Sequence, residues 1–179
     1  EGVTGRNVAG LIDNGGEHTI IIGAHFDHLG YGSEGSLFRG EPTIHNGADD
    51  NASGTAAVIQ LAKILKAKKS NYNFLFLAFS GEENGLWGSN YFSKNSTVDL
   101  ADVNYMINMD MVGRMNDEKT LAINGVGTSP SWDISLNAAN SDSLKLVKSE
   151  SGVGPSDHTS FYLQDLPVLH FFTGQHEDY

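Results

Sequence analysis

The sequence feature that most constrains the fold of this chain is a short apolar run that is followed closely by two adjacent acids. Residues Phe74–Phe79 are continuously apolar and rich in aromatic side chains, with polar residues on both flanks, which is typical of a buried β-strand. Glu82 and Glu83 follow within one turn, where open α/β sheets place their functional groups. Solvated turn residues are the simpler interpretation of this pair alone. The chemical alternative is a metal ion bound by one carboxylate, with the other left free as a base.

Similar apolar runs alternate with helical patterns along the chain. Thr19–Ala24 predicts a strand that leads into His25, and the spacing of apolar residues from Ala57 to Leu65 predicts an amphipathic helix. The same signals predict strands over 103–110, 120–123, 144–147 and 167–172, and helices over 86–94, 130–139 and 161–164. This alternation indicates a layered α/β domain with a mostly parallel sheet. The long Gly-rich stretch from Gly30 to Gly47 is expected to be a functional loop or a surface excursion.

The composition and charge of the chain exclude several classes of partner and of metal ligand. The chain has 179 residues, 39% of them hydrophobic, which suits one globular domain. Its net charge of −11 argues against a nucleic-acid partner or an anionic membrane surface. No apolar run approaches the ~20 residues of a membrane span. Cysteine is absent, so disulfides, a thiolate nucleophile and thiolate metal ligands are excluded, and any metal must be held by His, Asp and Glu.

Several His and carboxylate residues lie at the end of a predicted strand or in the loop before a helix. If those ends share one edge of a sheet, the side chains converge. Two imidazoles and three carboxylates suit zinc. They exceed the three protein ligands of a single catalytic zinc, but they suit two metals that share a bridging carboxylate. The candidate ligands are His25, Asp50, Glu83, Asp110 and His158.

The surrounding sequence strengthens this interpretation. His25-x-Asp27, the segment from Gly47 to Gly54 (GADDNASG), Ser80-Gly81-Glu82-Glu83, Asn108-Met109-Asp110 and Ser156-Asp157-His158 occur in this order. The order resembles that of the M28 peptidases, the co-catalytic zinc aminopeptidases related to the bacterial leucyl aminopeptidases. The resemblance extends from about Val8 to the end of the chain. It implies a three-layer sandwich with a mixed, mostly parallel central sheet flanked by helices. Residues 1–179 would form a single catalytic domain, which we expect to be trimmed at both ends relative to the family.

The resemblance also implies a role for each residue. Asp50 would bridge two Zn²⁺ ions per chain, with His25 and Asp110 completing one site and Glu83 and His158 the other. Glu82 would be the general base, and Asp27 the carboxylate that orients the His25 imidazole. The family pattern further places a cis peptide after the bridging acid, here between Asp50 and Asn51.

The expected substrates are therefore peptides with a free N-terminus, and the expected location is secreted or periplasmic. A glutaminyl cyclase, which uses one zinc, is the nearest alternative function. A carboxypeptidase or amidohydrolase with the same metal chemistry, and a non-catalytic binding domain on this scaffold, are further alternatives. The remaining histidines, His28, His45, His170 and His176, are expected at surface, loop or supporting positions, with His176 a candidate for the wall of the cleft.

Overall fold

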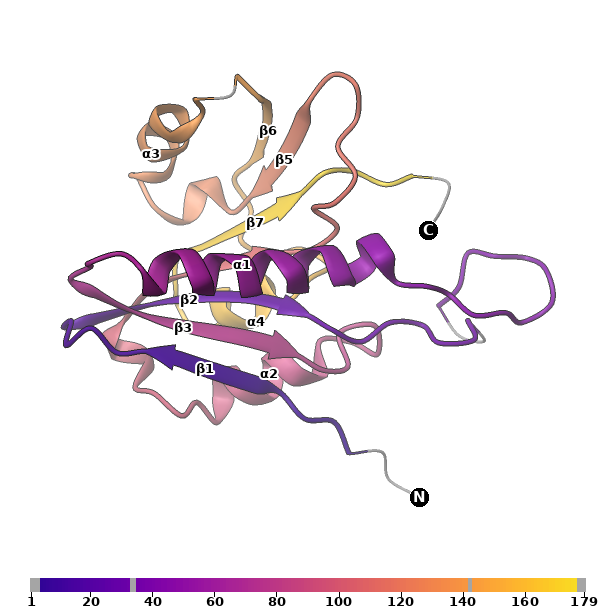
Figure 1. Ribbon diagram of the computed structural model, residues 1–179, viewed down its shortest axis with the longest axis horizontal. Coiled ribbons are helices and arrows are strands. Elements are labelled where there is room, and N and C mark those ends of the chain that lie inside the picture. The colour runs from indigo at the N-terminus through magenta and orange to yellow at the C-terminus, as the bar shows by residue number, and fades with distance from the viewer. Residues whose placement is uncertain (1–3, 33–34, 142, 177–179) are drawn as a thin grey trace.

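The structure is a computed structural model, and it describes residues 4–32, 35–141 and 143–176. The strands in these residues form one seven-stranded sheet in the order β1-β3-β2-β4-β7-β5-β6 (Figure 1). Their bounds are β1 Val8–Ile12, β2 His18–His25, β3 Tyr72–Phe79, β4 Val103–Met109, β5 Thr120–Asn124, β6 Lys145–Ser149 and β7 Val168–Phe172. The helices are α1 Gly54–Lys66, α2 Trp87–Lys94, α3 Trp132–Ala139 and α4 His158–Tyr162.

Most neighbouring strands run parallel, as predicted. Strand β2 pairs in parallel with β3 and with β4, and β4 pairs in parallel with β7. The antiparallel pairs are β1 with β3 and β5 with β7. All but the first residue of β2 are buried, which explains why this central strand appears in the sequence as a nearly continuous apolar run.

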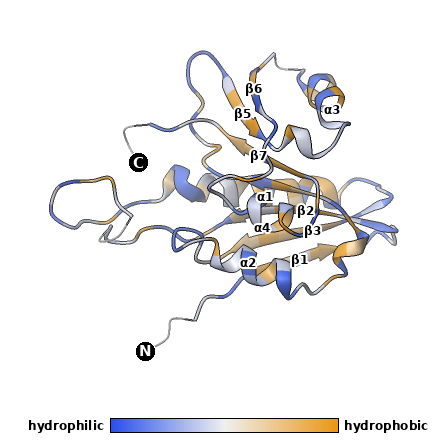
Figure 2. Cartoon of the chain, turned by 180° about the vertical axis from the view of Figure 1, so that it is seen from behind, coloured by the Kyte–Doolittle hydropathy of each residue, from blue (hydrophilic) through white to orange (hydrophobic). Residues whose placement is uncertain are grey.

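Helices cover both faces of the sheet, which confirms the expected sandwich. Helix α1 lies on one face, and α2 and α4 lie on the other (Figure 1). Val58 of α1 packs with Phe74 and Phe76, whereas Phe161 of α4 packs beside Phe79, with ring centroids 5.8 Å apart. Phe74 and Phe76 therefore lie on one face of β3 and Phe79 on the other, as the alternation of side chains along a strand requires. In Figure 2 the central strands are mostly hydrophobic and hydrophilic residues gather on the loops.

Two elements differ from the sequence prediction. Strand β1 was not predicted, because its residues are largely exposed and Gly10 interrupts the apolar pattern. It is held as an edge strand by its antiparallel register with β3. Helix α4 begins at His158, where the prediction began at Phe161. Among the described residues, no helix is long and apolar enough to cross a membrane.

Candidate metal centre

All the predicted site residues except His158 gather at the carboxyl edge of the central strands. His25 is the last residue of β2, Glu82 and Glu83 follow β3, and Asp110 comes directly after β4. Asp50 lies in the tight turn Ala48–Ser53 that precedes α1. Because β2 is parallel to both β3 and β4, the ends of these strands meet at one edge of the sheet.

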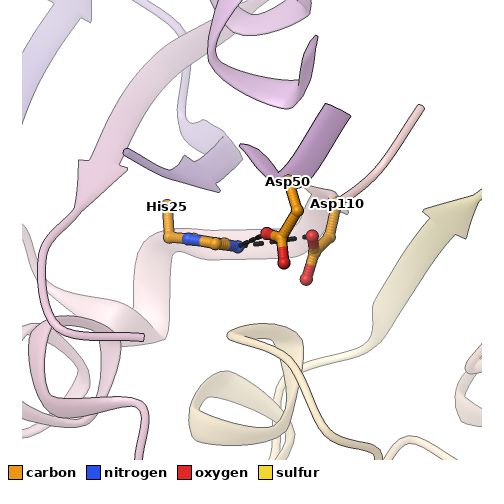
Figure 3. Close-up of side chains that lie close together, drawn as sticks. All are labelled: His25, Asp50 and Asp110. Atoms are coloured by element: carbon orange, nitrogen blue, oxygen red, sulfur yellow. Dashed lines mark hydrogen bonds and ion pairs between the residues drawn. The ribbon is translucent and has the colours of Figure 1, made fainter. Parts of the chain in front are cut away.

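One group of ligand atoms surrounds the imidazole of His25. Its Nε2 lies 3.1 Å from Asp50 Oδ1 and 3.3 Å from Asp110 Oδ1 (Figure 3). A single N–H can donate to only one of these carboxylates. Two ligands bound about 2.0 Å from a tetrahedral zinc lie about 3.3 Å apart. The three atoms therefore fit a shared cation better than they fit a hydrogen-bonded cluster.

A second group adjoins the first, and its imidazole comes from His28. The Nδ1 atom of His28 lies 2.8 Å from Glu83 Oε1 and 3.9 Å from Asp50 Oδ2. In each of the two groups, the potential ligand atoms all lie within 4.8 Å of one another. Asp50 therefore presents one oxygen to each group, which is the arrangement of a carboxylate that bridges two cations.

Asn51 holds the turn that carries Asp50. Its buried amide donates to the carbonyl of Met109 at 3.0 Å, and its Oδ1 accepts the N–H of Gly54 at 2.9 Å and that of Met111 at 3.2 Å. The Asp50–Asn51 peptide is cis, as the family pattern implies. A methyl group at Gly54 would lie 2.4 Å from Met109 O, so only glycine permits this close approach of the turn to the end of β4.

Asp27 connects the two strand ends mainly through its carboxylate. One of its oxygens accepts the N–H of Glu82 at 3.1 Å, and the other accepts that of Glu83 at 3.3 Å. His25 Nδ1 lies 3.1 Å from the main-chain oxygen of Asp27 and 3.7 Å from its carboxylate. The main-chain carbonyl is therefore the closer partner of the imidazole, and the carboxylate positions the two glutamates.

Burial and like charges raise the pKa of both glutamates. Burial, together with Asp157, Asp110 and Glu83, raises the pKa of Glu82 to about 9, although the charge of His25 opposes the rise. Burial and the Asp50 carboxylate likewise raise the pKa of Glu83. Burial alone would lower the pKa of His25, but hydrogen bonding to the Asp110 carboxylate raises it above its ordinary value. A bound cation would offset this negative charge and favour the ionised forms of the two glutamates near neutral pH.

His158, the remaining predicted ligand, belongs to neither group. It is fully buried in the first turn of α4, and its ring stacks on His170 with centroids 4.5 Å apart and an interplanar angle of 10°. Among the described residues, neither of its ring nitrogens has a hydrogen-bond partner. Burial, and then His170, lower the pKa of His158 to about 3. It is a neutral imidazole beside the site, and its role as a metal ligand stays a prediction.

A chain of hydrogen bonds links this region to Asp110. Ser156 Oγ donates to Asp110 Oδ2 at 2.7 Å and accepts from the Asn108 amide at 2.8 Å. The same amide lies 3.1 Å from His170 Nδ1. Burial lowers the pKa of His170 to about 4, so its neutral ring accepts this contact. The Asp110 carboxylate is thereby oriented from the loop before α4 as well as from β2.

Two histidines near the site were not predicted as ligands. His28 joins the second group, and the only sequence signal for it is its position three residues after His25. His176 lines the cleft, as considered from the sequence, and its Nε2 lies 2.9 Å from Asp49 Oδ2. Asp49 Oδ1 accepts the N–H of Gly113 at 2.7 Å. The two adjacent acids therefore have different contacts. Asp50 belongs to both groups of potential ligand atoms, whereas Asp49 bonds to the loops that carry Gly113 and His176.

The site opens into two neighbouring cavities. One, of about 400 Å³, is lined by Glu82, Glu83, Asp50 and Asp110 together with apolar residues such as Leu37 and Phe172. The other, of about 560 Å³, is lined by His28 and Asp50 and by Phe38, Ile44 and His45. Described residues of the loop between Gly30 and Gly47 contribute to both walls, so this part of the loop borders the cleft.

An α/β sandwich with two adjoining imidazole–carboxylate groups at the carboxyl ends of its parallel strands is the fold and site of a metalloprotein. The profile of Peptidase family M28 matches residues 7–179. The chain therefore belongs to peptidase family M28.

Named relatives are consistent with this family. Aminopeptidase YwaD of Bacillus subtilis is 33% identical over 165 residues, covering 88% of this chain and 32% of the relative. The crystal structure of BSAP, a zinc aminopeptidase from Bacillus subtilis, matches with a TM-score of 0.74 and 27% identity, covering 96% of this chain and 40% of that one. A glutaminyl cyclase from Bacteroides thetaiotaomicron has the same fold, with a TM-score of 0.74 and 18% identity, covering 97% of this chain and 65% of that one. The chain spans less than half the length of curated relatives that it matches.

Proposed function

We propose that this chain carries the catalytic site of a zinc aminopeptidase that binds two zinc ions per chain and removes residues from the free N-terminus of peptides. The observation that supports it most is the shared Asp50 carboxylate, whose oxygens lie 3.1 Å from His25 and 3.9 Å from His28 in two separate groups. Membership of family M28 and the named aminopeptidases among its relatives support the same reaction. Secretion of the protein stays a prediction.

Glu82 is the proposed general base. It lines the same cavity as the grouped carboxylates, and its Oε2 lies 3.9 Å from His25 Nε2. Zinc ions bound by the two groups would lower the pKa of a water molecule and polarise the carbonyl of the scissile bond. Glu82 would take a proton from the attacking water and return one to the leaving amine. The positive charge beside Glu82 would also keep it ionised, although burial favours its protonated form.

The proposal is tested by metal content and a substrate panel. The purified chain is dialysed against buffered zinc, its zinc is counted, and hydrolysis of amino-acid anilides is measured beside hydrolysis of the same anilides with a blocked α-amine. Two zinc ions per chain, with turnover only of the free amines, are expected. Two zinc ions with turnover of blocked substrates or of C-terminal residues would instead indicate an amidohydrolase or a carboxypeptidase.

The glutaminyl cyclase alternative makes a different prediction. It requires one zinc ion per chain and cyclisation of an N-terminal glutamine, without release of a chromogenic amine from simple anilides. Its support here is the shared fold of one structural neighbour, which does not specify a reaction. The two imidazole–carboxylate groups favour the two-cation hydrolase.

A further inference from the structure

We propose that Arg114 binds a carboxylate in the part of the peptide substrate that is released after the N-terminal residue is cut off. This inference rests on the proposed function and adds to it a preference for substrates whose leaving part is negatively charged. Arg114 lines the larger of the two cavities, of about 560 Å³, which also has Asp50 in its wall. Among the described residues that line this cavity, Arg114 is the one whose side chain keeps a positive charge at every physiological pH.

The loop that carries Arg114 is fixed beside the potential cation groups. Gly113 donates its N–H to Asp49 Oδ1 at 2.7 Å. A methyl group at Gly113 would lie 2.8 Å from Ser53 Cβ, so the loop packs directly against the tight turn Ala48–Ser53. The backbone beside Arg114 is therefore held against the same turn that presents Asp50 to the proposed zinc site.

His176 orients the guanidinium of Arg114. The Nη1 atom of Arg114 lies 3.4 Å from His176 Nδ1, and His176 Nε2 lies 2.9 Å from Asp49 Oδ2. Because a guanidinium only donates, His176 Nδ1 must accept, and the N–H of the neutral imidazole is then at Nε2 and is donated to Asp49. The side chains of His176 and Asp49 are 13% and 10% exposed, so Arg114 is supported from the inner side of the cavity wall.

This arrangement favours a carboxylate over the α-ammonium group of a peptide. A planar guanidinium holds a carboxylate through two parallel N–H···O bonds, whereas an ammonium group would be repelled by it. We therefore assign the leaving part of the peptide to the cavity of Arg114, and its N-terminal residue to the smaller cavity that contains Glu82. The negative charge of Asp49 is compensated in part, because its two oxygens accept from Gly113 and His176.

Two parts of a peptide can supply this carboxylate, which are its C-terminus and an acidic side chain after the scissile bond. The test uses the zinc-loaded chain and two pairs of dipeptides that begin with an amino acid whose anilide it hydrolyses. In the first pair glycine follows, either as the free acid or as its C-terminal amide. In the second pair the C-terminus is amidated, and either aspartate or asparagine follows. For each pair, release of the N-terminal amino acid gives the ratio of kcat/KM for the charged substrate to that for its uncharged partner.

The unmodified chain is expected to prefer the charged member of at least one pair, and that pair identifies the source of the carboxylate. Arg114→Ala should lower this ratio ~10–100-fold, which is the usual size of a hydrogen-bonded contact with a charged group. Arg114→Lys keeps the charge but loses the paired donors, and it should lower the ratio less. Arg6→Ala, at an exposed position before β1, is the control and should leave the ratio as it is.

Each ratio compares two substrates on one preparation, so a change in the amount of folded or zinc-loaded protein cancels. If Arg114→Ala keeps both ratios of the unmodified chain, Arg114 does not bind the substrate and the inference is wrong. It is equally wrong if the unmodified chain prefers neither charged substrate. Failure of the proposed function is seen separately, as a lack of anilide hydrolysis by the unmodified chain, since the leaving part of an anilide has no carboxylate.

Discussion

At the residue scale, the two adjacent glutamates after β3 have different surroundings. Glu83 contacts His28 at 2.8 Å and belongs to a potential cation group. Glu82 belongs to neither group, and its Oε2 lies 3.9 Å from His25 Nε2. The backbone N–H groups of both residues are held by Asp27. One turn therefore provides a ligand and a free base from consecutive positions.

Replacement of Glu82 should separate catalysis from metal binding. Glu82→Gln is expected to keep the zinc content of the unmodified chain but to lose at least ~100-fold in kcat, which is the usual size of a general-base effect. Glu83→Gln is the matched comparison and should lower the zinc content, because Glu83 is in a ligand group. Anilide kinetics and zinc analysis on the same preparations check both. Near-normal turnover by Glu82→Gln would contradict its proposed role.

Asp27 provides a second test at this scale. An amide at this position can accept only one of the two N–H groups that the carboxylate now accepts from Glu82 and Glu83. We expect Asp27→Asn to weaken zinc binding 10–100-fold, as is usual for residues that orient ligands. Chelator competition measures the affinity. Asp13→Asn, in an exposed turn that bonds to Gly15, is the control and should not change it.

At the scale of elements, helix α2 packs unusually close to the end of β3. A methyl group at Gly88 would lie 2.4 Å from the carbonyl oxygen of Ser80 and 2.7 Å from its amide nitrogen. Asn7 bonds to both segments, through the carbonyl of Gly88 at 2.8 Å and the N–H of Ser80 at 3.1 Å. This contact fixes where the strand ends, and therefore where the loop with Glu82 begins.

Gly88→Ala should consequently destabilise the fold. We expect a loss of roughly 1–3 kcal/mol in the free energy of unfolding, because the added methyl overpacks against backbone atoms that cannot move aside. Gly10→Ala in β1 is the control, since nothing lies within 4 Å of the methyl it would add, and its effect should stay within about 1 kcal/mol. Urea titration of the metal-free proteins measures both. Equal stabilities would show that the helix can shift at little cost.

Most elements could be predicted from the sequence because their apolar periodicity is set by burial on one or both faces. Strand β1 could not, since it is exposed and is specified by its pairing with β3. The site residues at strand ends were found because parallel strands bring their carboxyl ends together. His28 could not be distinguished from an ordinary loop histidine, because its approach to Glu83 at 2.8 Å depends on the course of the loop. The stacking of His158 on His170 likewise could not be predicted, because it depends on how α4 packs against β7 and not on the spacing of residues in the sequence.

At the scale of the whole molecule, the buried histidine pair connects stability to pH. The pKa values of His158 and His170 are lowered to about 3 and about 4, in both cases first by burial, from an unfolded value near 6.5. The unfolded chain therefore binds more protons than the folded chain between these limits. The contribution of the two neutral imidazoles to stability is therefore fully present above pH ~6.5, and it is lost as the pH falls through this range.

Each of these histidines is expected to lower the stability of the EDTA-treated protein by about 1.4 kcal/mol per pH unit between pH ~6.5 and ~4. The Glu82 carboxyl, whose pKa burial raises to about 9, contributes in the opposite direction over the upper part of this range. His170→Gln removes one of the two titrating groups and should therefore reduce the slope. Urea titrations across this pH range measure the slope for each protein. An unchanged slope in His170→Gln would contradict the assignment.

The imidazoles of the two groups of potential ligand atoms both come from one short stretch, His25-Phe26-Asp27-His28, whereas the carboxylates come from three other segments. The backbone of that stretch therefore sets the distance between the two groups. A single residue inserted after His25 would lie beyond the last strand pair of β2 with β3, so it would change this distance without changing the register of the sheet.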